Sequence, residues 1–316
     1  MWSPQRRSQS AVYSVLGILY VLLIFNILYF GGPSSFLAED EVLGDKSPQS
    51  LAPRQLLLSP ENCPASSFIM MIHVRADDFE KRKEWRSAYS PFQQLFNFTL
   101  FFIVGIPKNQ SVNFRLHAEH QEYGDLIMGD YMDHYENMTL KHLTHLRFFQ
   151  TKCQETRFLV KLDDDVAVNM NMLMSFISSI YDGPAPWFFL DTSYGPKIWC
   201  HVWYGTIVQR TSSLKWPVSR RRWKDDYWPE YCAGLGYIAT QESVTRLLKA
   251  ADKETWLWVD DVFVTGVLAQ KGQVQLVQIK NYYTLNEADP SYFSFGNSMF
   301  ALTYRNQTWD LFDAIN

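Results

Sequence analysis

The stretch RFLVKLDDD, residues 157–165, places three consecutive carboxylates directly after an apolar run. The apolar part predicts a buried strand. Residues two apart in extended backbone point to the same side, so we expect Asp163 and Asp165 to face one cleft and Asp164 to face away. Converging carboxylates repel one another unless a cation lies between them, and oxygen ligands suit Mn²⁺ or Mg²⁺. The pattern predicts a metal site at Asp163 and Asp165; a solvated acidic turn or a calcium site is the alternative.

Strands and helices alternate on both sides of this stretch. Short apolar runs predict strands over residues 68–74, 100–105, 125–128 and 157–162. Charged or amphipathic segments predict helices over residues 78–89, 112–123, 139–153 and 169–181. Such alternation is typical of an α/β layer with a mostly parallel sheet. Ligands of these sheets gather at the carboxyl ends of the strands, which is where the acidic triplet is expected.

A second acidic pair, Asp260 and Asp261, lies within the apolar and aromatic stretch WVDDVFVTG, residues 258–266. Apolar surroundings desolvate a carboxylate and raise its pKa. A carboxylate tuned in this way can take a proton from an attacking hydroxyl, so we predict that Asp261 is a general base. The alternative is a helix N-cap, and the two roles are compatible if Asp260 caps the helix and Asp261 acts on the substrate.

A glycine pair lies between the two acidic segments, in YWPEYCAGLGY, residues 227–237. Gly234 and Gly236 offer backbone that a bulky ligand can approach closely, and the flanking aromatic rings could pack on a sugar ring or a base. On its own, such a pair more often marks a turn or a kinked strand.

The N-terminal part of the chain predicts a membrane anchor. Residues 11–30, AVYSVLGILYVLLIFNILYF, carry no charge. At about 1.5 Å rise per residue, a helix of this length spans the roughly 30 Å hydrocarbon core of a bilayer. Basic residues precede the run and acidic residues follow it, so the positive-inside rule places the N-terminus in the cytoplasm. The competing interpretation is a cleaved signal peptide, which would have a shorter apolar run.

We therefore divide the chain into a cytoplasmic tail over residues 1–10, an anchor over residues 11–30, a luminal, proline-rich stem over residues 31–66 and a globular catalytic domain over residues 67–316. The net charge of −4 gives no basic balance that would indicate a nucleic-acid partner.

Sequons and cysteines agree with a secretory location. The sequons begin at Asn97, Asn109, Asn137 and Asn306, and each could accept a glycan only in a secretory compartment. The four cysteines are an even number, which predicts one or two disulfides in an oxidising lumen and leaves three complete pairings open. The chain has no CxxC pair, so a structural zinc site is not expected.

Several blocks of the chain, taken together, are more specific than any one of them. They are RKEWRSAY at 82–89, FIVG at 102–105, EYGDLI at 122–127, DYMDHYENMTLK at 130–141, KLDDDV at 161–166, YCAGLGY at 231–237 and DDVFVTG at 260–266. In order and spacing these blocks resemble the β1,3-galactosyltransferase family, glycosyltransferase family 31, over roughly residues 68–266. Tyr89 stands where the family has Trp, and Asp260 stands where it has Glu.

The resemblance implies a GT-A fold, a UDP-sugar donor, Mn²⁺ or Mg²⁺, and inversion at the anomeric carbon. It assigns Asp163 and Asp165 to contact with the metal and the diphosphate, and Asp261 to the general base. Further candidate contacts to the nucleotide-sugar are Asp164, Lys161, Gly234, Gly236, Arg82 and Arg86. For the two arginines the alternative is a solvated helix face.

The expected function is an inverting, metal-dependent glycosyltransferase of the Golgi membrane. It would move a hexose, most simply galactose in β1,3 linkage, from a UDP-sugar to a glycan acceptor on a glycoprotein or glycolipid. Transfer of N-acetylglucosamine or N-acetylgalactosamine also occurs in the family, and the protein could form a homo-oligomer.

Two other functions stay open on the sequence. Family members often have a late His that completes the metal site, and no His follows His201 here. This departure motivates the alternative of a luminal carbohydrate-binding or scaffolding protein without turnover. A glycoside hydrolase that uses two carboxylates is the third possibility.

Overall fold

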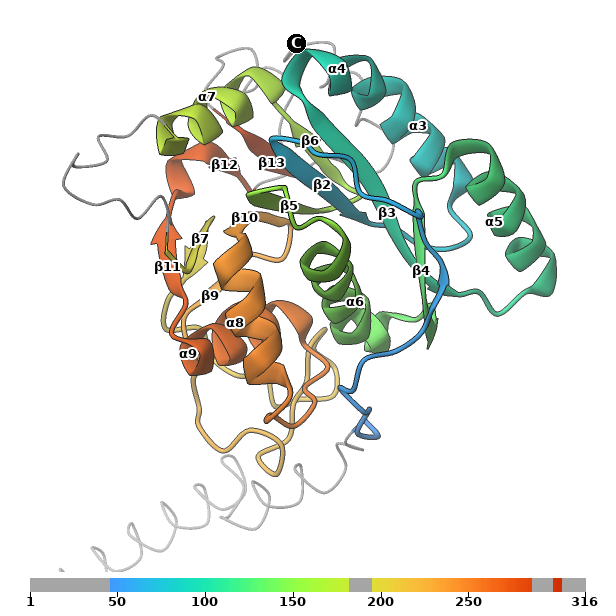
Figure 1. Cartoon of the computed structure of the whole chain (residues 1–316). Coiled ribbons are helices and arrows are strands. Elements are labelled where there is room, and N and C mark those ends of the chain that lie inside the picture. Colours follow the sequence, from blue (N-terminus) through green and yellow to red (C-terminus); the bar gives the residue numbers. More distant parts are fainter. Residues whose placement is uncertain (1–45, 182–194, 286–297, 303–316) are drawn as a thin grey trace, which may run out of the picture. The chain divides into compact units, whose positions relative to one another are not determined.

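The computed structural model describes residues 46–181, 195–285 and 298–302 (Figure 1). The predicted tail and anchor, part of the predicted stem and the sequon at Asn306 lie outside these residues. Within the described part of the chain, no helix combines the length and the apolar character that crossing a membrane requires. The described residues form two compact units, of which the smaller is Ile207–Asp226 and the larger contains all the others.

An eight-stranded sheet forms the centre of the larger unit, in the order β1-β4-β3-β2-β5-β10-β7-β11. Its strands are β1 Leu56–Leu58, β2 Phe68–His73, β3 Phe98–Ile106, β4 Leu126–Met132, β5 Phe158–Asp163, β7 Lys197–Cys200, β10 Gly236–Thr240 and β11 Gln275–Gln278. Strands β4, β3, β2 and β5 run parallel to one another. At the two ends of this group, β1 pairs antiparallel with β4 and β10 pairs antiparallel with β5. Beyond β10, β7 is antiparallel to β10, and β11 is parallel to β7.

The prediction of a mostly parallel sheet is therefore correct for the group β4-β3-β2-β5 and wrong for the other half, where the directions are mixed. Parallel neighbours need a crossover, which a helix supplies between each of these four strands. Strand β10 instead begins beside the end of β5, where Gly236 is the register partner of Leu162, so it runs against β5.

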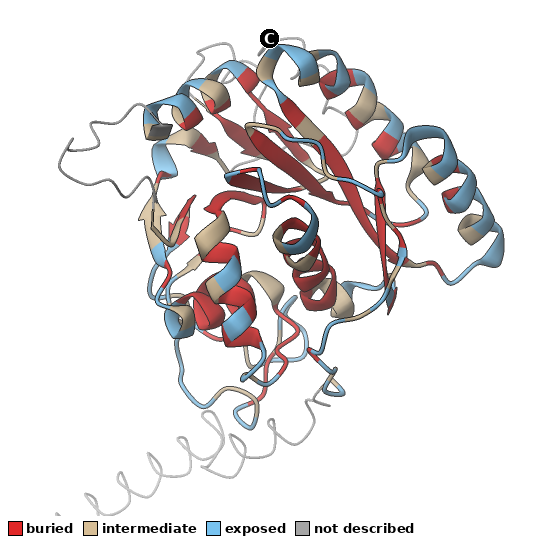
Figure 2. Ribbon diagram, in the orientation of Figure 1, coloured by how far each residue is buried: buried red, intermediate tan, exposed pale blue. Residues whose placement is uncertain are grey.

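Helices cover both faces of the sheet (Figure 1). The side chains of α3, α5 and α7 pack with Phe68, Met70 and Ile72 of β2 in one core cluster. On the other face, the Phe148 ring of α6 packs edge-on against Phe101 of β3, and α8 contacts β7 and β10. The longer helices are α3 Phe79–Tyr89, α5 Gln110–Tyr123, α6 Met138–Lys152, α7 Met170–Tyr181 and α8 Gln241–Ala251. In Figure 2 the central strands and much of α6 are buried, while α5 is exposed over much of its surface.

Short elements complete the larger unit. They are η1 Ser90–Phe92, α4 Gln93–Phe96, η2 Tyr135–Asn137, the π-helix η3 Val262–Leu268, α9 Ala269–Gly272 and η4 Lys280–Tyr282. A three-stranded sheet joins β12 Tyr283–Thr284, β13 Phe300–Leu302 and β6 Val166–Val168, and β8 Val202–Trp203 pairs with β9 Tyr231–Cys232. The strands and helices predicted between residues 68 and 181 are all present, with ends that differ by a few residues.

Two disulfides link the cysteines. Cys63, before β2, bonds to Cys153, which follows α6. Cys200, at the end of β7, bonds to Cys232 of β9. This structure agrees with the prediction of one or two disulfides and selects one of the three complete pairings.

The smaller unit, Ile207–Asp226, is a closed loop. Its ends meet because the amide of Val208 donates to the carbonyl oxygen of Asp226, at 2.9 Å. The Arg210 guanidinium donates to three carbonyl oxygens and so braces the loop from within. The segment holds six Lys and Arg residues against two Asp, so its charge is opposite in sign to that of the whole chain.

Candidate active site

The acidic triplet lies where the parallel strands β2 and β5 end. Asp163 is the last residue of β5, and its register partner is His73, the last residue of β2. The buried Lys161 ammonium lies two residues earlier on β5 and donates to Asp163 Oδ1, at 2.6 Å, and to the Gly234 carbonyl oxygen, at 2.5 Å. Burial lowers the pKa of Lys161, but the carboxylates of Asp163 and Asp260 have the larger, opposite effect. The pKa of Lys161 is therefore raised, and the ammonium stays charged. Lys161 thus organises the first carboxylate of the triplet.

The other two carboxylates lie beyond the strand. The extended backbone ends at Asp163, and Asp164 and Asp165 form the turn to β6. The alternation expected for a strand therefore does not apply to Asp165. Burial, and then the charge of Asp163, raise the pKa of Asp165. Burial, and then the charges of Asp165 and Asp163, raise the pKa of Asp164 to about 7. The Asp164 carbonyl oxygen accepts a hydrogen bond from the indole N–H of Trp85, at 3.1 Å, which ties the turn to α3.

The second acidic pair precedes the π-helix η3. Asp261 accepts the Val262 N–H through Oδ1, at 2.8 Å, so Asp261 makes the side-chain cap. The Asp260 carboxylate instead forms a hydrogen bond with His142 Nδ1, at 3.0 Å. The division of roles that made Asp260 the cap is therefore wrong, because the Asp260 carboxylate points to α6 rather than to the start of its own helix.

The two neighbouring carboxylates have opposite protonation preferences. Burial, and then the charge of Asp260, raise the pKa of Asp261 to about 7. For Asp260 burial acts in the same direction, but the hydrogen bond from His142 and the charge of Lys161 outweigh it and lower the pKa. A pair split in this way can hold one permanent charge and one exchangeable proton near neutral pH.

The two glycines of the GxG pair have separate roles. An ideal Cβ on Gly234 would lie 3.4 Å from Asp261 Oδ2, so the Gly234 backbone borders the carboxylate predicted to be the base. A Cβ on Gly236 would lie 2.7 Å from Leu162 Cδ2 and 3.0 Å from the Lys161 carbonyl oxygen. Gly236 therefore allows β10 to pack against β5, while Gly234 leaves space beside Asp261.

Arg82 and Arg86 of α3 are bound by carboxylates. The fully buried Arg82 makes two hydrogen bonds to Glu119 of α5, at 2.8 and 2.7 Å, and donates to the carbonyl oxygen of Arg75. Arg86 binds Glu119 and Asp125 at 2.7–2.8 Å. Burial raises the pKa of Glu119, but the two guanidinium groups outweigh it and lower the pKa. The solvated-face alternative is thus wrong: both arginines tie α3 to α5, and Arg82 also supports the backbone that follows β2.

A cavity of about 440 Å³, which sequence reasoning missed, opens at the carboxyl ends of β2, β3 and β4. Its lining includes Arg75 and Asp77 after β2, Lys108 and Asn109 after β3, Asp133, His134 and Tyr135 after β4, and Lys141 of α6. Lys141 binds Asp133 at 2.7 Å and the Val74 carbonyl oxygen at 2.8 Å. The sequence signal for this cavity was the cluster of polar residues after each predicted strand.

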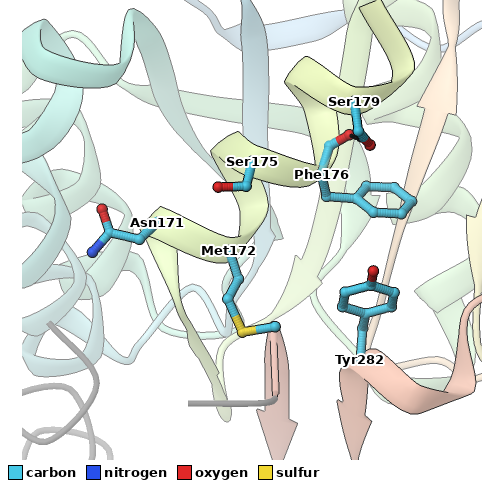
Figure 3. Close-up of a pocket in the computed structure, with 6 residues that line it drawn as sticks. All are labelled: Asn171, Met172, Ser175, Phe176, Ser179 and Tyr282. Carbon is cyan, nitrogen blue, oxygen red and sulfur yellow. Dashed lines mark hydrogen bonds between the residues drawn. The ribbon is translucent and has the colours of Figure 1, made fainter. Parts of the chain in front are cut away.

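A second hollow, of about 300 Å³, lies on α7 (Figure 3). Its lining residues are Asn171, Met172, Ser175, Phe176, Ser179 and Tyr282. None of them carries a full charge, whereas Arg75, Lys108 and Lys141 line the strand-end cavity, so that cavity suits an anionic ligand better.

Comparisons with known proteins identify a family. Residues 80–280 match the family described as "Galactosyltransferase". The protein "Beta-1,3-galactosyltransferase 4" of Rattus norvegicus is 26% identical over 286 residues, which cover 80% of this chain and 76% of that protein. "Lactosylceramide 1,3-N-acetyl-beta-D-glucosaminyltransferase" of the same organism is 27% identical over 222 residues, 67% of this chain and 56% of that protein. The chain therefore spans only about half the length of this second relative.

A solved structure is also similar. The crystal structure of a glycosyltransferase involved in the glycosylation of the major capsid of PBCV-1 aligns with 78% of this chain and 98% of its own, at 9% identity and a TM-score of 0.39. That similarity is too low to establish a shared fold by itself.

Proposed function

Because the chain belongs to the galactosyltransferase family and is thus a glycosyltransferase, we propose that it transfers a hexose from a UDP-sugar to a hydroxyl of a glycan acceptor, with inversion. The observation that carries this proposal is the split acidic pair. Asp260 stays ionised, and Asp261, with a pKa of about 7, can take up and release a proton near neutral pH. A binding protein or a scaffold has no need for such a group.

In the proposed reaction, Asp261 accepts the proton of the acceptor hydroxyl while that oxygen attacks the anomeric carbon of the donor. The bond from this carbon to the UDP oxygen breaks, and UDP leaves with the electron pair. Because Gly234 has no side chain, a sugar can approach the backbone beside Asp261 closely. We place the nucleotide in the strand-end cavity, where the cations Arg75, Lys108 and Lys141 outnumber the anions Asp77 and Asp133.

The acidic triplet fits a hard divalent cation by its donor chemistry. Asp163 and Asp165 offer carboxylate oxygens, and the charge of Asp163 raises the pKa of Asp165, a repulsion that a cation would relieve. Among the described residues no group of three His, Cys, Asp or Glu gathers to form a complete ligand set. Two carboxylates nevertheless suffice for Mg²⁺ or Mn²⁺, which commonly keep water and substrate phosphates as their other ligands. Such an ion, when bound, would neutralise charge on the diphosphate.

We propose galactose in β1,3 linkage as the transferred sugar and bond, and a glycoprotein or glycolipid as the acceptor. One similar rat protein carries β1,3-galactosyltransferase in its name and another carries N-acetylglucosaminyltransferase, so both donors belong in the assay. We also propose a Golgi membrane location with the catalytic domain in the lumen. The two disulfides favour an oxidising compartment, and exposed Asn97 is accessible to a glycan.

The test is UDP release by the full-length chain, with UDP-galactose, UDP-N-acetylglucosamine and UDP-N-acetylgalactosamine, each with and without Mn²⁺ and with a panel of glycan acceptors. We expect release with one donor. Asp163→Ala and Asp261→Asn should abolish it, and Asp261→Asn should still bind UDP. Asp252→Asn, a matched change at an exposed site after α8, should keep full activity. Binding of UDP without release from any donor would instead support the carbohydrate-binding alternative.

A further inference from the structure

Three histidines, a tyrosine and Asp260 form one buried cluster beside the proposed base. His73 ends β2, His142 and His145 lie on α6, and Tyr237 lies on β10. The contacts run in a line: His73 Nε2 to His145 Nδ1 at 2.8 Å, His145 Nε2 to the Tyr237 hydroxyl at 3.3 Å, that hydroxyl to His142 Nε2 at 2.8 Å, and His142 Nδ1 to Asp260 at 3.0 Å. The four ring-bearing residues are at most 4% exposed. The mechanism proposed above uses none of these four.

The carboxylate at the end of the line sets the direction of its hydrogen bonds. An ionised Asp260 can only accept, so His142 donates from Nδ1. Burial lowers the pKa of His142 and of the other two histidines, which keeps the rings neutral. A neutral His142 then accepts at Nε2 from the Tyr237 O–H. It follows that the Tyr237 oxygen accepts from His145 Nε2–H, and that His145 Nδ1 accepts from His73 Nε2–H.

The far end of the line supports this direction. His73 Nδ1 is buried and has no hydrogen-bond partner. In the direction derived above this nitrogen carries no hydrogen and is an unused acceptor. In the reverse direction, or with His142 as an imidazolium, His73 would carry an N–H at Nδ1 with no acceptor. A buried unsatisfied donor is a rare and costly arrangement, so the geometry selects the direction in which every donor points toward Asp260.

We infer that this line of hydrogen bonds holds the Asp260 carboxylate toward α6 as a fixed acceptor, and that His142 is the positioning residue that leaves Asp261 as the base. Hydrogen bonds in such a series polarise and strengthen one another. The inference rests on the proposed function for its catalytic consequence. The hydrogen-bond direction itself does not depend on that function.

Titratable side chains from two elements face the acidic pair. His142 reaches Asp260 from α6, and Lys161 and Asp163 act on the pair from β5. Substitution of His142 leaves Lys161 and Asp163 in place. Its effect can therefore be separated from that of the triplet.

The first experiment reads the tautomers and needs no activity. Long-range ¹H–¹⁵N correlation spectra of the full-length chain, labelled in histidine and assigned by single substitutions, should show His142 as the Nδ1–H tautomer. His73 and His145 should be Nε2–H tautomers, and all three should be neutral at pH 7. An Nε2–H or imidazolium form of His142 would overturn the inference, even if the protein is an active transferase.

The second experiment measures kcat and KM for two variants. His142→Leu removes the donor, and His142→Asn can place an N–H where Nδ1–H lies. We expect His142→Leu to lower kcat by about 10- to 100-fold, as for a misplaced catalytic group, with little change in KM for the UDP-sugar. His142→Asn should recover most of kcat, whereas a purely structural role would not separate these two variants. His117→Leu, at an exposed site on α5, is the control, and thermal melts verify folding.

The outcomes separate the two proposals. If the wild-type chain releases no UDP from any donor, the proposed function fails, and the tautomers alone still decide the direction of the line. If the wild type is active and His142→Leu keeps its kcat, the positioning role is wrong and the function stands.

Discussion

The adjacent carboxylates at 260 and 261 differ in a property that kinetics can measure. Asp261 has a pKa raised to about 7 by burial and by Asp260, so its ionised form is the minor one below that pH. Since the base must be ionised, we expect kcat to fall about tenfold per pH unit below pH 7 and to level off above it. A steady-state pH profile checks this, and a kcat independent of pH between 5 and 8 would exclude Asp261 as the base.

The two glycines beside this pair give a matched prediction. Gly236→Ala forces a methyl to 2.7 Å from Leu162 and 3.0 Å from strand backbone, so we expect a loss of about 1–3 kcal/mol in the free energy of unfolding. Gly234→Ala makes an ordinary contact, 3.4 Å from Asp261 Oδ2, and should change stability little. Its methyl would cover the base, so kcat/KM should fall roughly 10- to 100-fold. Denaturant unfolding and UDP release measure the two effects, and unchanged kcat/KM in Gly234→Ala would show that no ligand crosses that backbone.

At the scale of single elements, the π-helix η3 sets the position of Asp261. Its Thr265 hydroxyl donates to the Asp261 carbonyl oxygen, at 2.7 Å, and accepts from the Cys232 amide, at 2.9 Å. One side chain therefore ties the helix to β9. π-helical turns occur often at functional sites, where they change the direction of a neighbouring residue.

Thr265→Val keeps the volume of this side chain and removes both hydrogen bonds. The Cys232 N–H would be left buried without its partner, so we expect a loss of about 1–3 kcal/mol in the free energy of unfolding, together with lower kcat. Thr265→Ser retains the hydroxyl and should behave nearly like the wild type. Equal stability of the Val and Ser variants in denaturant titrations would contradict this role.

The sequence predicted the elements between residues 68 and 181 because each apolar run is short, buried on both faces and followed by an amphipathic segment. It did not predict that β10 runs antiparallel to β5, because strand direction depends on where the chain enters the sheet, and local pattern does not encode this. The convergence of Gly234, Asp261 and Asp163 follows from that pairing. The sequence therefore identified these site residues without their mutual arrangement.

The histidine cluster escaped sequence reasoning for a related reason. His142 and His145 are three residues apart, which places them on one face of a helix, and this spacing was the available signal. The burial of that face depends on the tertiary structure, and so does the arrival of His73 and Tyr237 from two strands. The wrong prediction that Asp260 caps the helix has the same origin, because the partner of Asp260 is His142.

At the scale of the whole molecule, two sets of buried groups act on stability in opposite directions as pH falls. The three histidines have pKa values lowered by burial from 6.5, so the unfolded chain takes up protons first, and stability is lost below pH 6.5. Asp261 and Asp164, with pKa values raised to about 7, take up protons first in the folded chain, and their effect grows as pH falls from 7 toward 4.

Asp261→Asn removes one of the two opposing acids. We expect the stability of this variant to fall more steeply between pH 7 and 5 than that of the wild type, by about 1.4 kcal/mol per pH unit. Denaturant unfolding at several pH values, with chelator present, measures the difference. Identical slopes for Asp261→Asn and the wild type would refute the assignment.

The disulfide between Cys63 and Cys153 closes a ring over a sequence separation of 90 residues, which contains β2, β3, β4 and α6. A protease that cuts once inside this ring, for example in the exposed helix α5, leaves both fragments covalently joined. Such a nicked molecule would migrate as one band without reductant and as two bands with it. A reducing gel therefore separates the two fragments of a chain cut in this half of the protein, whereas a gel without reductant keeps them together.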